Sequence, residues 1–268
     1  MNSSPPSPSP YSSTFFDHIR AGSRSSAEVI APLLLSHLPS CSSVADVGCG
    51  TGSWLRVFQS LAPISVTGFD GDYVDRSALE IDPASFHPTD LSSPPPWPLS
   101  YDLTLSLEVA EHLPPSAAPH FIAFLTALSP VVLFSAAIPH QGGTHHLNEQ
   151  WPDYWAALFA SHDFVPIDFL RDAVWQNPLV ERWYAQNILL FVKKAFLPSL
   201  PSLQKLAALT HPHSLSRVHP NSFLIASTQI SQLRDEVRSL NPSHLGLRSL
   251  LRLLPNAFRK ACHRALHP

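Results

Sequence analysis

The segment VADVGCGTGSWL (residues 44–55) decides the fold of this chain. It opens with a short apolar run, typical of a buried strand, which leads directly into Gly48, Gly50 and Gly52. Such glycines let the backbone turn tightly and approach a ligand with no Cβ in the way. The residues that follow, 53–62, have the pattern of a helix whose first amides would face polar groups of the ligand. The segment therefore predicts a strand, a ligand-binding turn and a helix.

Outward from this segment, apolar strands and amphipathic helices alternate along the chain. Ser25 and Glu28 have the spacing of a capping box, which predicts a helix start at residue 25. The alternation predicts an α/β fold with a doubly wound sheet and crossover helices, and its last two strands look like an antiparallel pair. We expect helices over 25–39, 53–62, 116–128 and 151–162, and strands over 43–48, 64–70, 101–108, 131–138, 164–170 and 185–192.

Composition and charge divide the 268 residues into three parts. We expect a disordered leader rich in Pro and Ser over 1–20, a globular domain over 21–197 and a basic helical extension over 198–268. The leader has no apolar core, so it does not resemble a secretory signal. Residues 1–197 hold 8 Lys and Arg against 18 Asp and Glu, whereas residues 198–268 hold 9 against 2. The extension could therefore contact a partner, a membrane surface or nucleic acid, and its alternative interpretation is a solvated helical tail.

Two helical segments are predicted within the extension. Residues 227–240 place Ile230, Leu233, Val237 and Leu240 at spacings of three and four, which suits a packing or coiled-coil helix. The segment 245–266 is basic and amphipathic.

The apolar stretch 121–139 has nearly the length of a membrane span, but Pro130 divides it. We interpret it as a helix end followed by a buried strand. Cys41, Cys49 and Cys262 are widely spaced and match no metal or disulfide framework, so we expect a reducing, cytoplasmic location.

Two nucleotide ligands suit the glycine turn. A dinucleotide would require G-x-G-x-x-G, and here Gly52 comes one residue too early. Asp46, inside the preceding strand, would repel a pyrophosphate and attract an ammonium group. Asp70 follows the second strand, where an acidic residue usually binds ribose hydroxyls.

With these motifs, residues 40–192 resemble a class I S-adenosylmethionine-dependent methyltransferase. The resemblance implies a Rossmann-like seven-stranded sheet of order 3-2-1-4-5-7-6. It also implies that Asp70 binds the ribose, that Asp90 and Leu91 bind the adenine, and that Glu108 faces the cofactor and the acceptor. The residues expected around the methionine end are Asp46, Gly48, Cys49, Gly50 and Gly52.

The segment EVAEH (108–112) supplies Glu108, Glu111 and His112 at the rim of the predicted sheet. It resembles the ligand set of small-RNA 2′-O-methyltransferases and of ubiquinone-type O-methyltransferases, with a further histidine expected from 140–151. Carboxylate and imidazole ligands suit Mg²⁺ or Mn²⁺, so the expected metal ligands are Glu108, Glu111, His112 and His146. Metal-free acid–base catalysis and purely structural histidines are the alternatives. For catalysis itself we expect Glu111, His112, His145 and His146, and His140 lies in the same segment.

Residues 20–193 also resemble bacterial-type methyltransferases that modify small molecules or sugars. We therefore expect O-methyl transfer to a small molecule or a glycan intermediate. An RNA 2′-O-methyltransferase with a divalent metal and a non-catalytic cofactor-binding scaffold are the two alternatives.

Overall fold

The computed structural model describes residues 13–240. Contacts within the chain divide these residues into two units, the first ending at His219 and the second beginning at Pro220. The domain boundary expected after residue 197 stays a prediction. The extent of the leader, expected over 1–20, also stays a prediction, and the first helix begins within that range, at Ser13. The predicted segment 245–266 lies outside the described residues.

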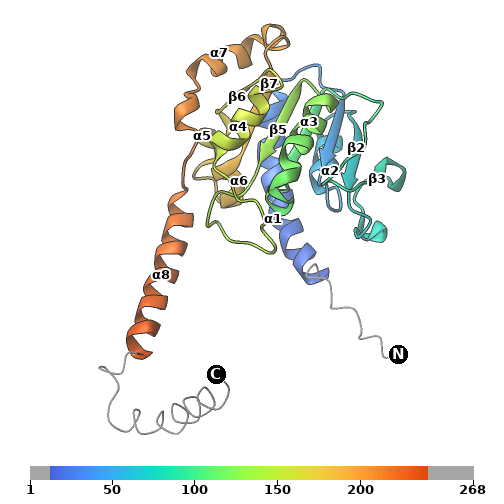
Figure 1. Ribbon diagram of the computed structural model, residues 1–268. Coiled ribbons are helices and arrows are strands. Elements are labelled where there is room, and N and C mark those ends of the chain that lie inside the picture. Colours follow the sequence, from blue (N-terminus) through green and yellow to red (C-terminus); the bar gives the residue numbers. More distant parts are fainter. Residues whose placement is uncertain (1–12, 241–268) are drawn as a thin grey trace, which may run out of the picture. The chain divides into compact units, whose positions relative to one another are not determined.

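A seven-stranded sheet forms the centre of the first unit, with the strand order β3-β2-β1-β4-β5-β7-β6 (Figure 1). This order is the one expected from the resemblance, and the prediction is confirmed. The first five strands run parallel, and β7 pairs antiparallel with both β5 and β6. The strands are β1 (Ser43–Val47), β2 (Ser65–Asp70), β3 (Phe86–Pro88), β4 (Leu103–Leu107), β5 (Val131–Ser135), β6 (Phe164–Ile167) and β7 (Leu189–Lys193).

Helices cover both faces of the sheet, because the central strands are apolar on both sides. Figure 1 shows α3 (Ala118–Leu128) and α4 (Pro152–Ala160) together in front of the sheet, where their buried side chains share one apolar cluster. The opposite face carries α1 (Ser13–Leu35), α2 (Ser53–Leu61), α5 (Leu170–Val174), α6 (Arg182–Asn187) and α7 (Pro201–Leu209).

The second unit contains one described helix, α8 (Pro220–Leu240). It begins seven residues before the predicted start at 227. Ile230, Leu233 and Val237 are all exposed on it among the described residues.

Three local predictions need correction or refinement. Ser25 does not cap a helix, because α1 is already formed there and the Ser25 hydroxyl donates to the carbonyls of Gly22 and Leu179. Residues 185–187 end helix α6 instead of opening a strand, because the cap amide of Ile188 closes that turn on the carbonyl of Tyr184. The apolar stretch 121–139 is indeed the end of α3 followed by β5. In the part of the chain that the structure describes, no helix has both the length and the apolar character needed to cross a membrane.

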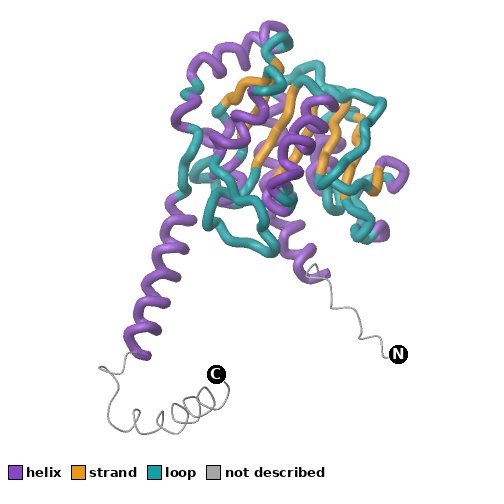
Figure 2. Tube along the Cα trace, in the orientation of Figure 1, coloured by secondary structure: helices purple, strands orange, loops and turns teal. Residues whose placement is uncertain are grey.

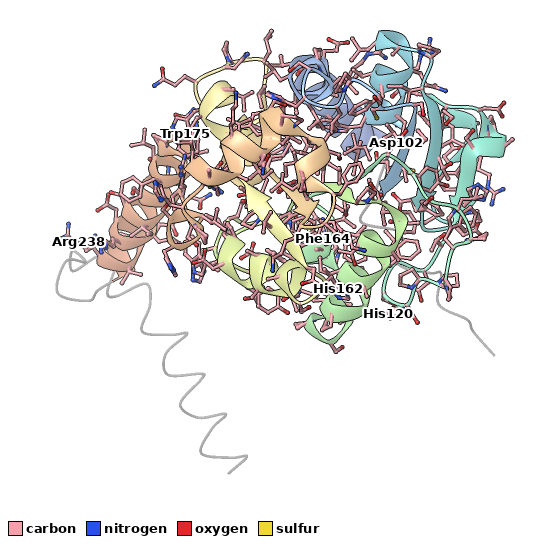
Figure 3. The ribbon with its side chains drawn as sticks, turned by 90° about the horizontal axis from the view of Figure 1, so that it is seen from above. Asp102, His120, His162, Phe164, Trp175 and Arg238 are labelled. Carbon is pink, nitrogen blue, oxygen red and sulfur yellow. The ribbon has the colours of Figure 1, made fainter. Side chains whose placement is uncertain are left out.

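The amino ends of β1 and β4 are joined by Asp102, which Figure 3 labels. One oxygen of its carboxylate accepts hydrogen bonds from the amides and hydroxyls of Ser42 and Ser43. These contacts hold the pKa of Asp102 below its usual value, although partial burial opposes them. These hydrogen bonds therefore stabilise the amino edge of the sheet. The expected site residues lie at the opposite, carboxyl edge.

Candidate functional site

The glycine turn follows β1 at the carboxyl edge of the sheet. Gly48, Gly50 and Gly52 all have positive φ angles, of 90°, 53° and 86°, which side-chain-bearing residues rarely adopt. At Gly48 a Cβ would also collide with the side chain of Val109. The turn therefore requires glycine at Gly48 both for its conformation and for the approach of the segment that follows β4.

Asp70, at the end of β2, holds this turn in place. Its Oδ2 accepts a hydrogen bond of 2.7 Å from the amide of Gly50, and its Oδ1 accepts bonds from the amide of Gly71 and the hydroxyl of Tyr73. Burial raises the pKa of Asp70, and these three bonds oppose the rise. The predicted ribose-binding residue thus has its two oxygens fixed beside the predicted glycine turn.

Most amides of the turn are already used inside the protein. Gly48 and Cys49 both donate to the carbonyl of Phe69, and Gly52 donates to the carbonyl of Cys49. With Gly50 bonded to Asp70, four amides of the turn are engaged. These four amides of the turn are therefore not free for a ligand, and the expectation that the first amides of α2 face the ligand stays a prediction.

Asp46 lies buried in β1 behind the turn. Burial raises its pKa from 3.8 to about 8, and the negative charge of Asp70 adds to the rise. A buried carboxylate of this kind is stabilised in its charged form by a cation placed beside it. The site thus has a built-in preference for a positively charged group near Asp46.

The predicted adenine-binding pair follows β3. Asp90 is exposed, and its Oδ1 accepts hydrogen bonds from the amide and hydroxyl of Ser92, which lower its pKa. Leu91 is buried beside it. An apolar side chain next to an exposed carboxylate can pack against the face of an adenine ring while the carboxylate accepts a hydrogen bond from its edge.

Glu108 directly follows β4 with a φ of 56°, an uncommon value for a residue with a side chain. Its Oε1 accepts a hydrogen bond of 3.0 Å from the side-chain amide of Asn187, and its Oε2 accepts one of 2.9 Å from that of Gln141. Burial raises the pKa of Glu108, and the bond from Asn187 is the strongest influence that opposes it. Both oxygens are therefore directed by residues from α6 and from the loop after β5.

Glu111 lies in the short 3₁₀ turn Ala110–His112 and is 1% exposed. Neither oxygen of its carboxylate makes a hydrogen bond of good geometry, although the backbone of Glu111 and Ala137 lies close enough to favour its charge, and Nδ1 of His112 is buried without a partner. Burial and the neighbouring Glu108 raise the pKa of Glu111 well above its usual value. A buried carboxylate with so few hydrogen bonds is costly, so its presence favours a ligand beside it.

His146 comes to this group from the long loop between β5 and α4, drawn in teal in Figure 2. The centroid of its ring lies 4.9 Å from the ring centroid of His112, and its Nδ1 contacts Oε1 of Glu149 at 2.9 Å. A Cβ on Gly143 would collide with the other edge of the His146 ring, so this glycine lets the loop backbone close over the imidazole. Ligand atoms of Glu111, His112 and His146 all lie within 4.8 Å of one another.

One cavity of about 950 Å³ collects these residues. Among its described lining residues there are six carboxylates and a single Lys or Arg, which is Arg182. His145 and His140 do not line it, and both are exposed. The acidic residues are Asp46, Asp70, Asp72, Asp90, Glu108 and Glu111.

Several lining residues were not singled out from the sequence. Gln141 lies in the predicted histidine-rich loop, so its position was an available signal. Asn187 was hidden because its segment resembles a strand, whereas Asn187 ends helix α6 and reaches Glu108. Tyr73 and Tyr184 have no sequence pattern that indicates a site, and only the fold brings them to the cavity.

The family described as Methyltransferase domain matches residues 16–178. A search of curated proteins found no match to this sequence.

Solved structures share the fold at low sequence identity. CalS10, an amino pentose methyltransferase from Micromonospora echinaspora, is 15% identical, with 69% of this chain and 99% of that chain covered and a TM-score of 0.50. The sugar N-methyltransferase KedS8 from Streptoalloteichus sp ATCC 53650 is 15% identical, with 72% and 99% covered and a TM-score of 0.51. The plantazolicin methyltransferase BpumL is 14% identical, with 68% and 88% covered and a TM-score of 0.50.

Proposed function

This chain belongs to the methyltransferase-domain family as an S-adenosylmethionine-dependent enzyme, and from that premise we propose that it methylates a hydroxyl oxygen of a small molecule or glycan. One observation carries the proposal. The glycine turn with Asp46 and Asp70 and the group of Glu111, His112 and His146 line the same cavity. A cofactor and an acceptor can therefore meet there. The similar structures named above include an amino pentose methyltransferase and a sugar N-methyltransferase, which agrees with a sugar-like acceptor; the choice of oxygen over nitrogen is the proposal's own.

The cofactor end of the cavity is formed by the turn and the acidic residues behind it. Asp46 would face the ammonium group of the methionine moiety, which stabilises the charged carboxylate that burial disfavours. Asp70 would accept the ribose hydroxyls, replacing the bond that the Tyr73 hydroxyl now makes at 2.6 Å. Leu91 would pack on the adenine and Asp90 would accept from its amino group. Gly48, Cys49, Gly50 and Gly52 would surround the methionine chain.

Methyl transfer requires alignment more than covalent help from the protein. The acceptor oxygen attacks the methyl carbon, and the carbon–sulfur bond breaks with its electrons passing to sulfur, which yields S-adenosylhomocysteine. The hydroxyl proton passes to a neutral imidazole, for which His146 and His112 are the two candidates. Burial lowers the pKa of His112, and the adjacent His146 lowers it further, so the neutral form is favoured. Glu149 contacts Nδ1 of His146 and so fixes the orientation of its ring.

The same residues could instead bind a divalent cation. The buried carboxylate of Glu111 and the nearby nitrogens of His112 and His146 suit Mg²⁺ or Mn²⁺. The oxygens of Glu108, the fourth expected ligand, accept hydrogen bonds from Asn187 and Gln141, and its part in metal binding stays a prediction. When bound, such an ion would stabilise the negative charge on the acceptor oxygen.

The cavity lining argues against the RNA alternative. Six carboxylates and one guanidinium would repel a phosphate backbone, whose binding depends on Lys and Arg contacts.

The proposal is tested by two variants and a matched control. Each protein is incubated with labelled S-adenosylmethionine and a library of hydroxylated small molecules and glycans. We expect Glu111→Ala and His146→Ala to lose methyl transfer while they retain S-adenosylhomocysteine binding. His145→Asn, an exposed position in the same loop with a φ of 56° that asparagine tolerates, should remain active. Full activity of both alanine variants would end the assignment.

A further inference from the structure

Arg182 is the only Lys or Arg among the described residues that line the cavity. It opens helix α6, and its guanidinium lies over the ring of Trp183, 5.2 Å from the ring centroid. Among residues 22–239, whose side chains the structure describes, no carboxylate forms an ion pair with it. Four other arginines of the first unit are paired: Arg24 with Glu28 and Glu80, Arg76 with Asp72, Arg171 with Asp168, and Arg217 with Asp168 and Asp172. Arg56, by contrast, is exposed on α2 outside the cavity.

The methionine moiety of the cofactor carries a carboxylate, and Arg182 is the one permanently charged cation among the described residues that line the cavity. Four amides of the glycine turn are engaged within the protein. The hydroxyl of Ser53 donates to Glu80, and that of Ser23 is bonded to Tyr184. Six carboxylates line the remaining wall. An anionic group of the ligand would be repelled from most of this surface and attracted to the guanidinium.

Tyr184 connects Arg182 to the methionine end of the site. It lies two residues further along α6, lines the same cavity, and packs edge-on against Trp54 of α2 at 5.4 Å between ring centroids. Burial raises the pKa of Tyr184 to about 12, and the charges of Glu108 and Asp46 contribute to the rise. Arg182 and Tyr184 of α6 thus line the same cavity as Asp46, the carboxylate proposed to face the ammonium group.

We infer that Arg182 binds the carboxylate of the methionine moiety of S-adenosylmethionine. This inference rests on the proposed function, because it assumes that this cofactor fills the cavity. With Asp46 at the ammonium and Arg182 at the carboxylate, both charges of the amino-acid end are met by opposite charges of the protein. The pairing of a guanidinium with a carboxylate also fixes orientation, because its donors form a planar fork.

The test is a thermodynamic cycle between one side chain and one ligand group. S-Adenosylmethionine and its decarboxylated form differ only in the carboxylate, and calorimetry gives the affinity of each for the wild-type protein and for Arg182→Met. We expect the wild type to prefer the carboxylate-bearing ligand by roughly tenfold or more. We expect Arg182→Met to lose that preference while it binds the decarboxylated ligand about as tightly as the wild type does. Arg182→Lys should recover part of the preference.

The outcomes separate the two proposals. Arg56→Met is the matched control, since Arg56 is exposed on α2 and does not line the cavity, and it should keep the full preference. If the wild type binds both ligands equally, or if Arg182→Met retains the preference, Arg182 does not bind the carboxylate and the proposed function still stands. If the wild type binds neither ligand, both proposals fall.

Discussion

The carboxylate of Asp70 accepts a hydrogen bond of 2.7 Å from the amide of Gly50, twenty residues earlier in the chain. This bond joins the end of β2 to the turn after β1. The residue proposed to bind the ribose therefore also sets the conformation of the turn proposed to surround the methionine end. Cofactor binding and local structure are coupled through one side chain.

Replacing Asp70 should show this coupling. Asp70→Ala removes the ribose acceptor and leaves the amide of Gly50 without its partner. We expect S-adenosylhomocysteine to bind about ten- to a hundredfold more weakly, as for the loss of charged hydrogen bonds. Calorimetry measures the change, and Asp75→Ala, an exposed position that does not line the cavity, is the control. Equal losses in the two variants would refute the role of Asp70.

The glycine turn should tolerate a side chain at one position better than at another. Gly48→Ala combines a φ of 90° with a collision against Val109, so we expect it to lower the free energy of unfolding by about 2–4 kcal/mol. Gly50→Ala meets no atom within 4 Å and has a φ of 53°, so about 1–2 kcal/mol is expected. Urea unfolding measures both values. The double variant Gly48→Ala/Val109→Ala should recover part of the loss, and absence of recovery would show that the collision is not the cause.

Asp46 should make the stability of the free protein depend on pH. Its pKa is about 8 in the folded chain, against an ordinary value of 3.8. Between these values the unfolded chain has released the proton and the folded chain retains it, so the folded state loses stability as the pH rises. Asp46→Asn cannot ionise and lacks this loss.

The expected result is a difference between variant and wild type that grows with pH. Between pH 5 and pH 8, the free energy of unfolding of Asp46→Asn relative to that of the wild type should increase by roughly 1–3 kcal/mol. The same variant should bind S-adenosylhomocysteine more weakly, because the ammonium loses its partner. Asp75→Asn, exposed in the same unit, provides the control for urea unfolding at each pH. A difference that does not change with pH would mean that Asp46 titrates normally.

The metal alternative has a direct readout in binding. If Glu111, His112 and His146 hold a divalent cation, Mn²⁺ should bind the wild-type chain in calorimetry, and a chelator should lower its thermal midpoint. Glu111→Gln should weaken Mn²⁺ binding at least about tenfold. Unchanged Mn²⁺ binding in Glu111→Gln would place the ion elsewhere. If the wild type binds no Mn²⁺, acid–base catalysis by the histidines alone stands.

Much of the fold could be predicted because its signals are local. Alternating apolar runs and the glycine turn identify β1, α2 and β2, and the strand order followed from the resemblance. The start of α1 could not be found in the same way, since Ser25 and Glu28 have the spacing of a cap but lie inside a longer helix. A local pattern cannot show that an earlier segment continues the helix.

Site residues that belong to a short sequence motif could be predicted. Site residues that only the fold brings together could not. Glu111, His112 and His146 were named from short segments, and the structure places their ligand atoms together. Asn187 and Arg182 come from α6, far along the chain from Glu108, and no spacing connects them. Their contribution depends on how β7 returns the chain to β5, which is a property of the whole sheet.

The central claim is tested most directly by calorimetry of the full chain. The two ligands compared are S-adenosylhomocysteine and NAD, the dinucleotide that would compete for such a turn. We predict one S-adenosylhomocysteine bound per chain, weaker binding in Asp70→Ala, and no heat with NAD. Tight binding of NAD together with no heat from S-adenosylhomocysteine would contradict the assignment of this turn to a methyl-donor cofactor.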